Sequence, residues 1–182
     1  GQSSLQDATI ALKYRNMYRQ YERGSFSLIG SAGITFPASS YPTDVAVPIG
    51  IRATTLQARI VGQYNSHAGW FLHAQTGYEL RILPDALHAV PILLRAGFGA
   101  RQYYVEGWVE WFNTLGAGSD DSINAGRGSD WLRAGGVLYV PLTRSFGVFG
   151  GGAYIFSGRN IGQSTRLNTG VVWKLRSKRA GG

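Results

Sequence analysis

The sequence predicts an all-β protein, and more narrowly an antiparallel up-and-down transmembrane β-barrel. The first reason is that long segments alternate apolar and polar residues with a period of two, so each strand has one apolar and one polar face. The second is composition: the chain has 26 Gly, 5 Trp, 10 Tyr and 8 Phe among its 182 residues, but only 15% charged residues. Water-soluble proteins have about 25%. The third is an alternation of short and long connections between the segments.

The first four strands are expected at residues 8–18, 26–36, 56–65 and 70–81. In 26–36 every even-numbered residue is apolar or glycine, whereas the odd-numbered ones include Ser27, Ser31 and Thr35. The other three segments show the same alternation, less strictly, with Ile10, Ile60 and Leu72 among the apolar residues of the even face. Because residues two apart share a face of a strand, all four strands are two-sided.

Five more strands are expected at residues 90–100, 103–111, 132–142, 146–156 and 167–175. The apolar parity changes from even to odd after Gln102, where Tyr103 and Val105 take over from Phe98. A tight turn at Arg101 and Gln102 accounts for the change, because partners across such a hairpin join an even residue to an odd one.

The connections after the first, third, fifth and seventh segments are short, and those after the second, fourth, sixth and eighth are longer. This asymmetry is typical of outer-membrane barrels, which have short periplasmic turns and long outer loops. A soluble β-sandwich is the other interpretation, and it would gather the apolar side chains in one core. The barrel instead directs five central leucine and isoleucine side chains outward to lipid: Leu28, Ile60, Leu72, Leu94 and Leu138.

Nine or ten strands are visible, the tenth being a weak candidate at 44–53 that Pro48 disfavours. In a meander of nine, the first and last strands run in the same direction, and a closed antiparallel barrel needs an even number. We therefore expect an odd number of strands to precede residue 1, or another chain to fill the gap. The barrel domain is predicted at 1–175, followed by a basic tail at 176–182.

Five segments resemble the outer-membrane β-barrels of the phenol-degradation (MetA-pathway) transporter family, in the same order. They are DATIALKYR (7–15), GSFSLIGSAGITFPAS (24–39), LQARIVGQYNS (56–66), GWFLHAQTGYEL (69–80) and RLNTGVVWKL (166–175). The resemblance implies a barrel of about twelve strands, of which this chain would lack the first three, and passage of hydrophobic or aromatic solutes.

The polar parity predicts which charged side chains face the lumen. They are Lys13, Arg15, Arg19, Arg59, Arg81, Arg95, Arg101, Arg133, Arg166 and Lys174, against Glu79, Glu106 and Glu110. A surplus of cations in a narrow lumen favours anionic solutes. Alternatively, the charges pair across strands, as Arg95 would with Glu106 or Glu110, and fill the barrel.

The sequence thus predicts an outer-membrane channel, porin-like, for passive passage of small hydrophobic or anionic solutes across the Gram-negative envelope. The alternative is a non-conducting barrel that anchors a larger membrane assembly. We expect no enzymatic activity, because His67, His73 and His88 form no catalytic set, and no cofactor or metal. Spread cations argue against nucleic acid. The expected partners are outer-membrane lipid, lipopolysaccharide, and partner chains or further copies of this chain.

Overall fold

The computed structural model describes residues 7–39, 53–83, 86–115, 129–159 and 161–174, and all its regular elements are strands. Nine strands form one antiparallel sheet in sequence order. They are β1 (Asp7–Tyr21), β2 (Gly24–Pro37), β3 (Thr54–Ser66), β4 (Trp70–Leu83), β5 (Leu87–Gly99), β6 (Tyr104–Leu115), β7 (Asp130–Pro141), β8 (Phe146–Arg159) and β9 (Thr165–Trp173). The predicted nine-strand meander is confirmed, whereas the candidate strand at 44–53 and the tail at 176–182 lie outside the described residues, except for Ala53.

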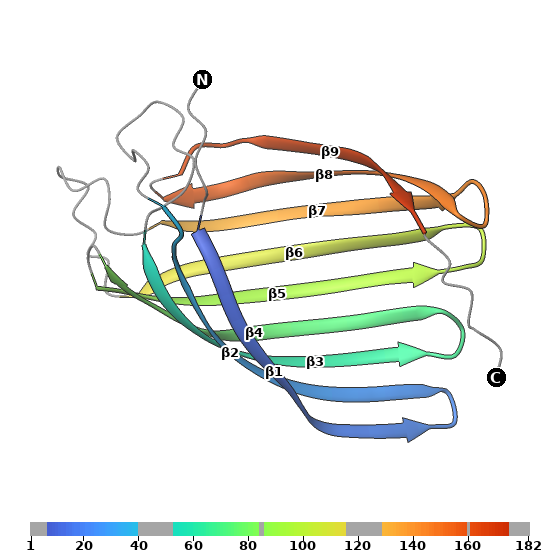
Figure 1. The fold of residues 1–182 in the computed structure, drawn as a ribbon, viewed down its shortest axis with the longest axis horizontal. Coiled ribbons are helices and arrows are strands. Elements are labelled where there is room, and N and C mark those ends of the chain that lie inside the picture. The colour runs from blue at the N-terminus through green and yellow to red at the C-terminus, as the bar shows by residue number, and fades with distance from the viewer. Residues whose placement is uncertain (1–6, 40–52, 84–85, 116–128, 160, 175–182) are drawn as a thin grey trace.

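The strands are long, at 9 to 15 residues. Strands of globular proteins usually have five or six residues, and a tilted strand needs about 9–11 to cross a bilayer. Figure 1 shows one curved sheet, with the turns that join β1 to β2, β3 to β4, β5 to β6 and β7 to β8 gathered at one end. We call this end the turn end of the sheet, and the other the loop end.

The predicted alternation of connection lengths is only partly confirmed. At the turn end the connections are residues 22–23, 67–69, 100–103 and 142–145, all short as predicted. At the loop end, 38–53 and 116–129 are long, but 84–86 is as short as a turn and 160–164 only slightly longer. The connection between β4 and β5 was predicted too long, because both strands extend beyond the residues whose apolar and polar alternation is clearest.

The two faces of the sheet differ as the parity predicts. Along β4 and β6 the exposed and less exposed residues alternate strictly, from Trp70 to Tyr78 and from Tyr104 to Trp111. The buried strand residues Ser27, Val61 and Thr114 share one face, which we call the inner face. The opposite, outer face carries the exposed apolar side chains.

The large apolar side chains do not meet in a common interior, as a sandwich would require. Ile60 is 50% exposed, Leu72 52%, Leu94 55% and Leu138 49%. Leu28 is half-buried instead, opposite Met17 of β1. A single sheet with an exposed apolar face is unusual in water, and it suggests a surface that faces a membrane.

The sheet does not close into a barrel. The strand order runs from β1 to β9 without a β1 to β9 pairing, so each of these strands has one open edge within the described chain. The fold shown is therefore an open nine-stranded antiparallel sheet. The hairpin of β5 and β6 does have the predicted register, since every pair joins an even residue to an odd one, as Phe98 to Val105.

Candidate functional site: the inner face of the sheet

A row of polar and aromatic side chains crosses the inner face. Ser27, Gln63, His73, Arg95 and Trp108 are successive cross-strand partners from β2 to β6. Partners in adjacent strands have side chains on the same face, so residues far apart in the sequence form one continuous surface. His73 Nδ1 lies 3.5 Å from Gln63 Oε1 within this row.

Every glutamate of the inner face is paired with an arginine. Glu79 accepts a hydrogen bond from Arg59, and Glu106 Oε2 lies 3.6 Å from Arg95 Nη1. The predicted pairing of Arg95 with a glutamate is thus confirmed for Glu106. Glu110 pairs with Arg133 instead. Glu110 Oε2 lies 2.5 Å from Arg133 Nη2, because the register of β6 and β7 places these two residues directly opposite each other.

Three predicted lumen cations have no carboxylate partner among the described residues. Lys13 is the cross-strand partner of Ser31, Arg15 of Ile29, and Arg166 of Ala153. The guanidinium carbon of Arg15 lies 5.1 Å from the centre of the Tyr18 ring. Lys174 follows β9, and its ammonium lies 5.4 Å from the centre of the Tyr139 ring. The inner face therefore carries more cations than anions.

Arg101 is placed differently from the prediction. It lies exposed in the turn between β5 and β6, where the Ala100 N–H donates to the Tyr103 carbonyl at 2.8 Å. The strand ends at Gly99, so the alternation that assigned Arg101 to a face no longer applies at this position.

A β-bulge in β1 also changes a predicted face. Arg15 pairs with Ile29 and Met17 with Leu28, so Asn16 is the extra residue. Beyond it the parity is reversed, because a bulge opposes two residues to one on the neighbouring strand. Tyr18, expected with the apolar residues, is opposite Ser27 on the inner face, and Arg19, expected inside, is opposite Phe26 on the outer face.

Aromatic rings of the inner face lie over glycines of the next strand. A Cβ on Gly135 would lie 2.6 Å from the Trp108 ring, one on Gly97 2.5 Å from Phe71, and one on Gly170 2.6 Å from Phe149. All three aromatic residues are direct cross-strand partners of these glycines. The sequence could have placed Trp108 on the inner face, because after the parity change at Gln102 the even-numbered residues Glu106, Trp108 and Glu110 share the polar face.

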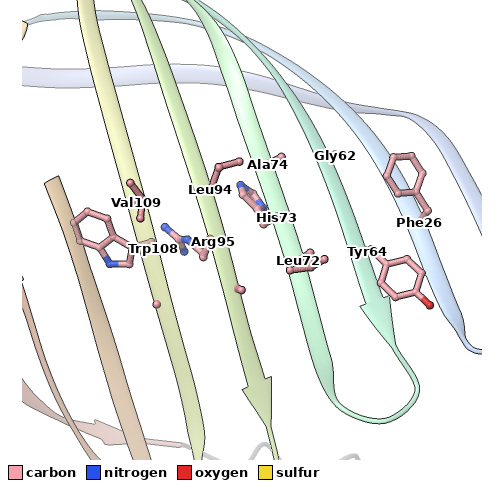
Figure 2. Close-up of a pocket in the computed structure, with 12 residues that line it drawn as sticks. Phe26, Gly62, Tyr64, Leu72, His73, Ala74, Leu94, Arg95, Trp108 and Val109 are labelled. Atoms are coloured by element: carbon pink, nitrogen blue, oxygen red, sulfur yellow. The ribbon is translucent and has the colours of Figure 1, made fainter. Parts of the chain in front are cut away.

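Both faces of the described sheet carry a depression. The inner one, of about 170 Å³, is lined by Trp108, Val137, Arg166 and Asn168, among others. The larger one, of about 530 Å³, is shown in Figure 2, and nine of its twelve lining residues belong to the outer face. These nine are Phe26, Gly62, Tyr64, Leu72, Ala74, Leu94, Ala96, Gly107 and Val109. We call it the outer depression.

The described residues contain no group of three or more His, Cys, Asp or Glu side chains able to hold a metal ion. They also contain no helix that is long and apolar enough to span a bilayer.

No family model matches the chain, and neither a curated protein nor a solved structure matches it.

Proposed function

We propose that the sheet is the greater part of an outer-membrane β-barrel whose lumen passes small anionic solutes passively. The observation that carries this proposal is the charge distribution on the inner face. Glu79, Glu106 and Glu110 are all paired with arginine, which leaves Lys13, Arg15 and Arg166 without a carboxylate partner in the described chain. A polar lumen with surplus cations favours anions.

Two of the paired arginines also have a buried hydrogen-bond donor that is unsatisfied within the described chain. Arg59 Nη1 and Arg95 Nε are buried and have no hydrogen-bond partner among the described residues. Such donors are costly to leave unsatisfied, and water or a passing anion can satisfy them in a wet lumen. The resemblance to the phenol-degradation transporter family supports solutes that combine an acid group with an apolar or aromatic body.

The placement in the membrane is supported by strand length and by the outer face. Twelve or more residues in eight of the strands are sufficient to cross the hydrocarbon region at the tilt of a barrel strand. Apolar outer side chains such as Leu94 would contact lipid.

A non-conducting barrel that anchors a larger assembly is the alternative. The ion pairs between neighbouring strands and the flat position of the Trp108 ring favour it, since side chains that bind each other can fill a narrow barrel. Conductance separates the two proposals, because only the first requires an open path for ions.

The test is single-channel recording of the full-length protein in planar bilayers under a tenfold KCl gradient. The wild type is expected to conduct, with a reversal potential whose sign shows chloride preference. Replacing both Arg15 and Arg166 by Gln should lower the chloride-to-potassium permeability ratio severalfold, whereas Arg101→Gln, in a turn, serves as the matched control. A cation-selective wild type contradicts the proposal, and absence of conductance favours the anchor.

A further inference from the structure

The bulge at Asn16 places a charge on a face that is otherwise apolar. Arg19 is exposed and lies opposite Phe26, one of the residues that line the outer depression. By register, no other Lys, Arg, Asp or Glu of the described strands lies on the outer face, apart from the pair of Arg159 and Asp130 at the loop end. An isolated guanidinium at this place needs an anionic partner or water.

The bulge residue adds a second polar group beside this arginine. A Cβ on Gly30, whose register places it on the outer face, would lie 3.4 Å from Asn16 Oδ1. The Asn16 amide therefore lies on the outer side of β1, within the same strand as Arg19. Inserting one residue into β1 thus moves two hydrogen-bonding side chains to the outer face.

Arg19 lies near the end of β1, at a height where the lipid headgroups would begin if the sheet spans a membrane. It lies two residues before the end of β1, which is about 7 Å at the rise of a strand. Tyr64 and Trp70 lie near the same end, with ring centres 5.0 Å apart. Tyrosine and tryptophan concentrate where the hydrocarbon meets the headgroups, so the surrounding residues are those of a membrane interface.

The outer depression begins at Phe26, the cross-strand partner of Arg19, and extends over β3 to β6. Four of its lining residues, Gly62, Ala74, Ala96 and Gly107, have small side chains or none. The bulkier Leu72 and Leu94 also line it, from β4 and β5 (Figure 2). Phe26 is the rim residue next to Arg19, one strand away, and neighbouring strands lie about 4.8 Å apart. Three inner-face residues, His73, Arg95 and Trp108, also line the depression, whereas the outer face contributes no charged side chain to it.

We propose that Arg19 and the outer depression together bind one anionic phospholipid, with its phosphate at the guanidinium of Arg19 and an acyl chain in the depression. Guanidinium and phosphate make two parallel hydrogen bonds, and the apolar floor excludes water from the acyl chain. The inference rests on the proposed membrane placement of the outer face, but not on conduction through the lumen.

The experiment is native mass spectrometry of the full-length protein, titrated in detergent with phosphatidylglycerol or with phosphatidylcholine of the same acyl chains. We expect one phosphatidylglycerol to bind at least fivefold more tightly than phosphatidylcholine. Arg19→Gln should abolish this preference. Arg15→Gln, in the same strand before the bulge and on the inner face, is the matched control and should retain it.

A second variant tests the acyl position. A Cβ on Gly62 meets only the Phe26 ring, at an ordinary 3.6 Å, so a side chain can start there without overlap, and Gly62→Leu directs its isobutyl group over the floor of the outer depression. It should weaken binding of both lipids about tenfold.

Equal binding of both lipids to the wild type overturns the proposal, as does an Arg19→Gln variant that keeps the preference. An unchanged affinity in Gly62→Leu also overturns it. The two proposals fail separately, because Arg15→Gln is expected to change ion selectivity without changing lipid preference, and Arg19→Gln is expected to do the reverse.

Discussion

Arg59 and Ile60 are neighbours in β3, and their exposure is the reverse of what a water-soluble surface shows. The Arg59 side chain is only 15% exposed and is bound to Glu79, whereas Ile60 is 50% exposed. Charged side chains are normally the most exposed in water, and isoleucine the most buried. The exposure of these two neighbours therefore suggests that the outer face is a membrane-facing surface.

Ile60→Arg should destabilise the protein if the outer face contacts lipid. Ile60 lies six residues from either end of β3, so an arginine there would lie near the middle of the bilayer, at a cost of about 2–4 kcal/mol. Equilibrium unfolding from lipid vesicles in urea measures this cost. Gln75→Arg, on the inner face of β4, is the control and should change the free energy of unfolding much less. Equal costs for the two variants would argue against a lipid-facing outer surface.

At the scale of the strand, glycine and aromatic partners fix how neighbouring strands fit. The Trp108 ring occupies the space over Gly135 where any other residue would have a side chain, and the backbone oxygen of Gly152 closes it from the other side. Cross-strand pairs of an aromatic residue and a glycine help to set register in β-sheets. Glycines without such neighbours should be free to change.

Gly135→Ala should therefore cost about 1–3 kcal/mol by overpacking. The new methyl group would lie 2.5 Å from the Gly152 carbonyl oxygen and 2.6 Å from the indole ring, so one of them must move. Gly150→Ala is the matched control in the neighbouring strand, because nothing lies within 4 Å of its Cβ, and it should change stability by less than about 0.5 kcal/mol. Urea unfolding curves of the two variants give the comparison. A Gly135→Ala variant as stable as the control would show that the Trp108 ring is held loosely.

In the molecule as a whole, the main feature is that β1 and β9 each have one edge without a partner strand in the described part of the chain. Both are odd-numbered strands of an antiparallel meander, so they run in the same direction. Their outer residues are the most exposed apolar side chains of the sheet, with Leu12 79% and Leu167 82% exposed. Unpaired backbone in lipid costs several kcal/mol per group, so both edges need partners in a membrane.

An odd number of additional strands would pair both edges in the antiparallel sense. We therefore expect the folded particle extracted from membranes to have a mass above the 19.8 kDa of this chain, through further strands of the same polypeptide or a second protein. Native mass spectrometry measures the particle, and denaturing mass spectrometry separates the two sources. A folded 19.8 kDa monomer with β1 hydrogen-bonded to β9 would contradict this expectation.

Sequence alone determined the strands and most of their faces. Alternation with a period of two depends only on local backbone geometry, so the outward position of Ile60 and the inward position of Arg59 could be predicted from their parity. The reversal at Arg101 and Gln102 was also readable, because a short hairpin fixes which residues are opposite each other. Nine strands and the hairpin register of β5 and β6 follow from such local rules.

Only the tertiary structure decided the rest. Asn16 and Met17 interrupt the alternation, but Tyr18 and Arg19 resume it, so only pairing with β2 shows that a residue is inserted and that Tyr18 and Arg19 exchange faces. The partner of Glu110 was likewise open until register placed Arg133 opposite it. The outer depression needs five strands side by side, and the open edges are a property of the whole sheet. Parity is a local property of one strand, whereas bulges, partners and closure depend on how the strands are paired in space.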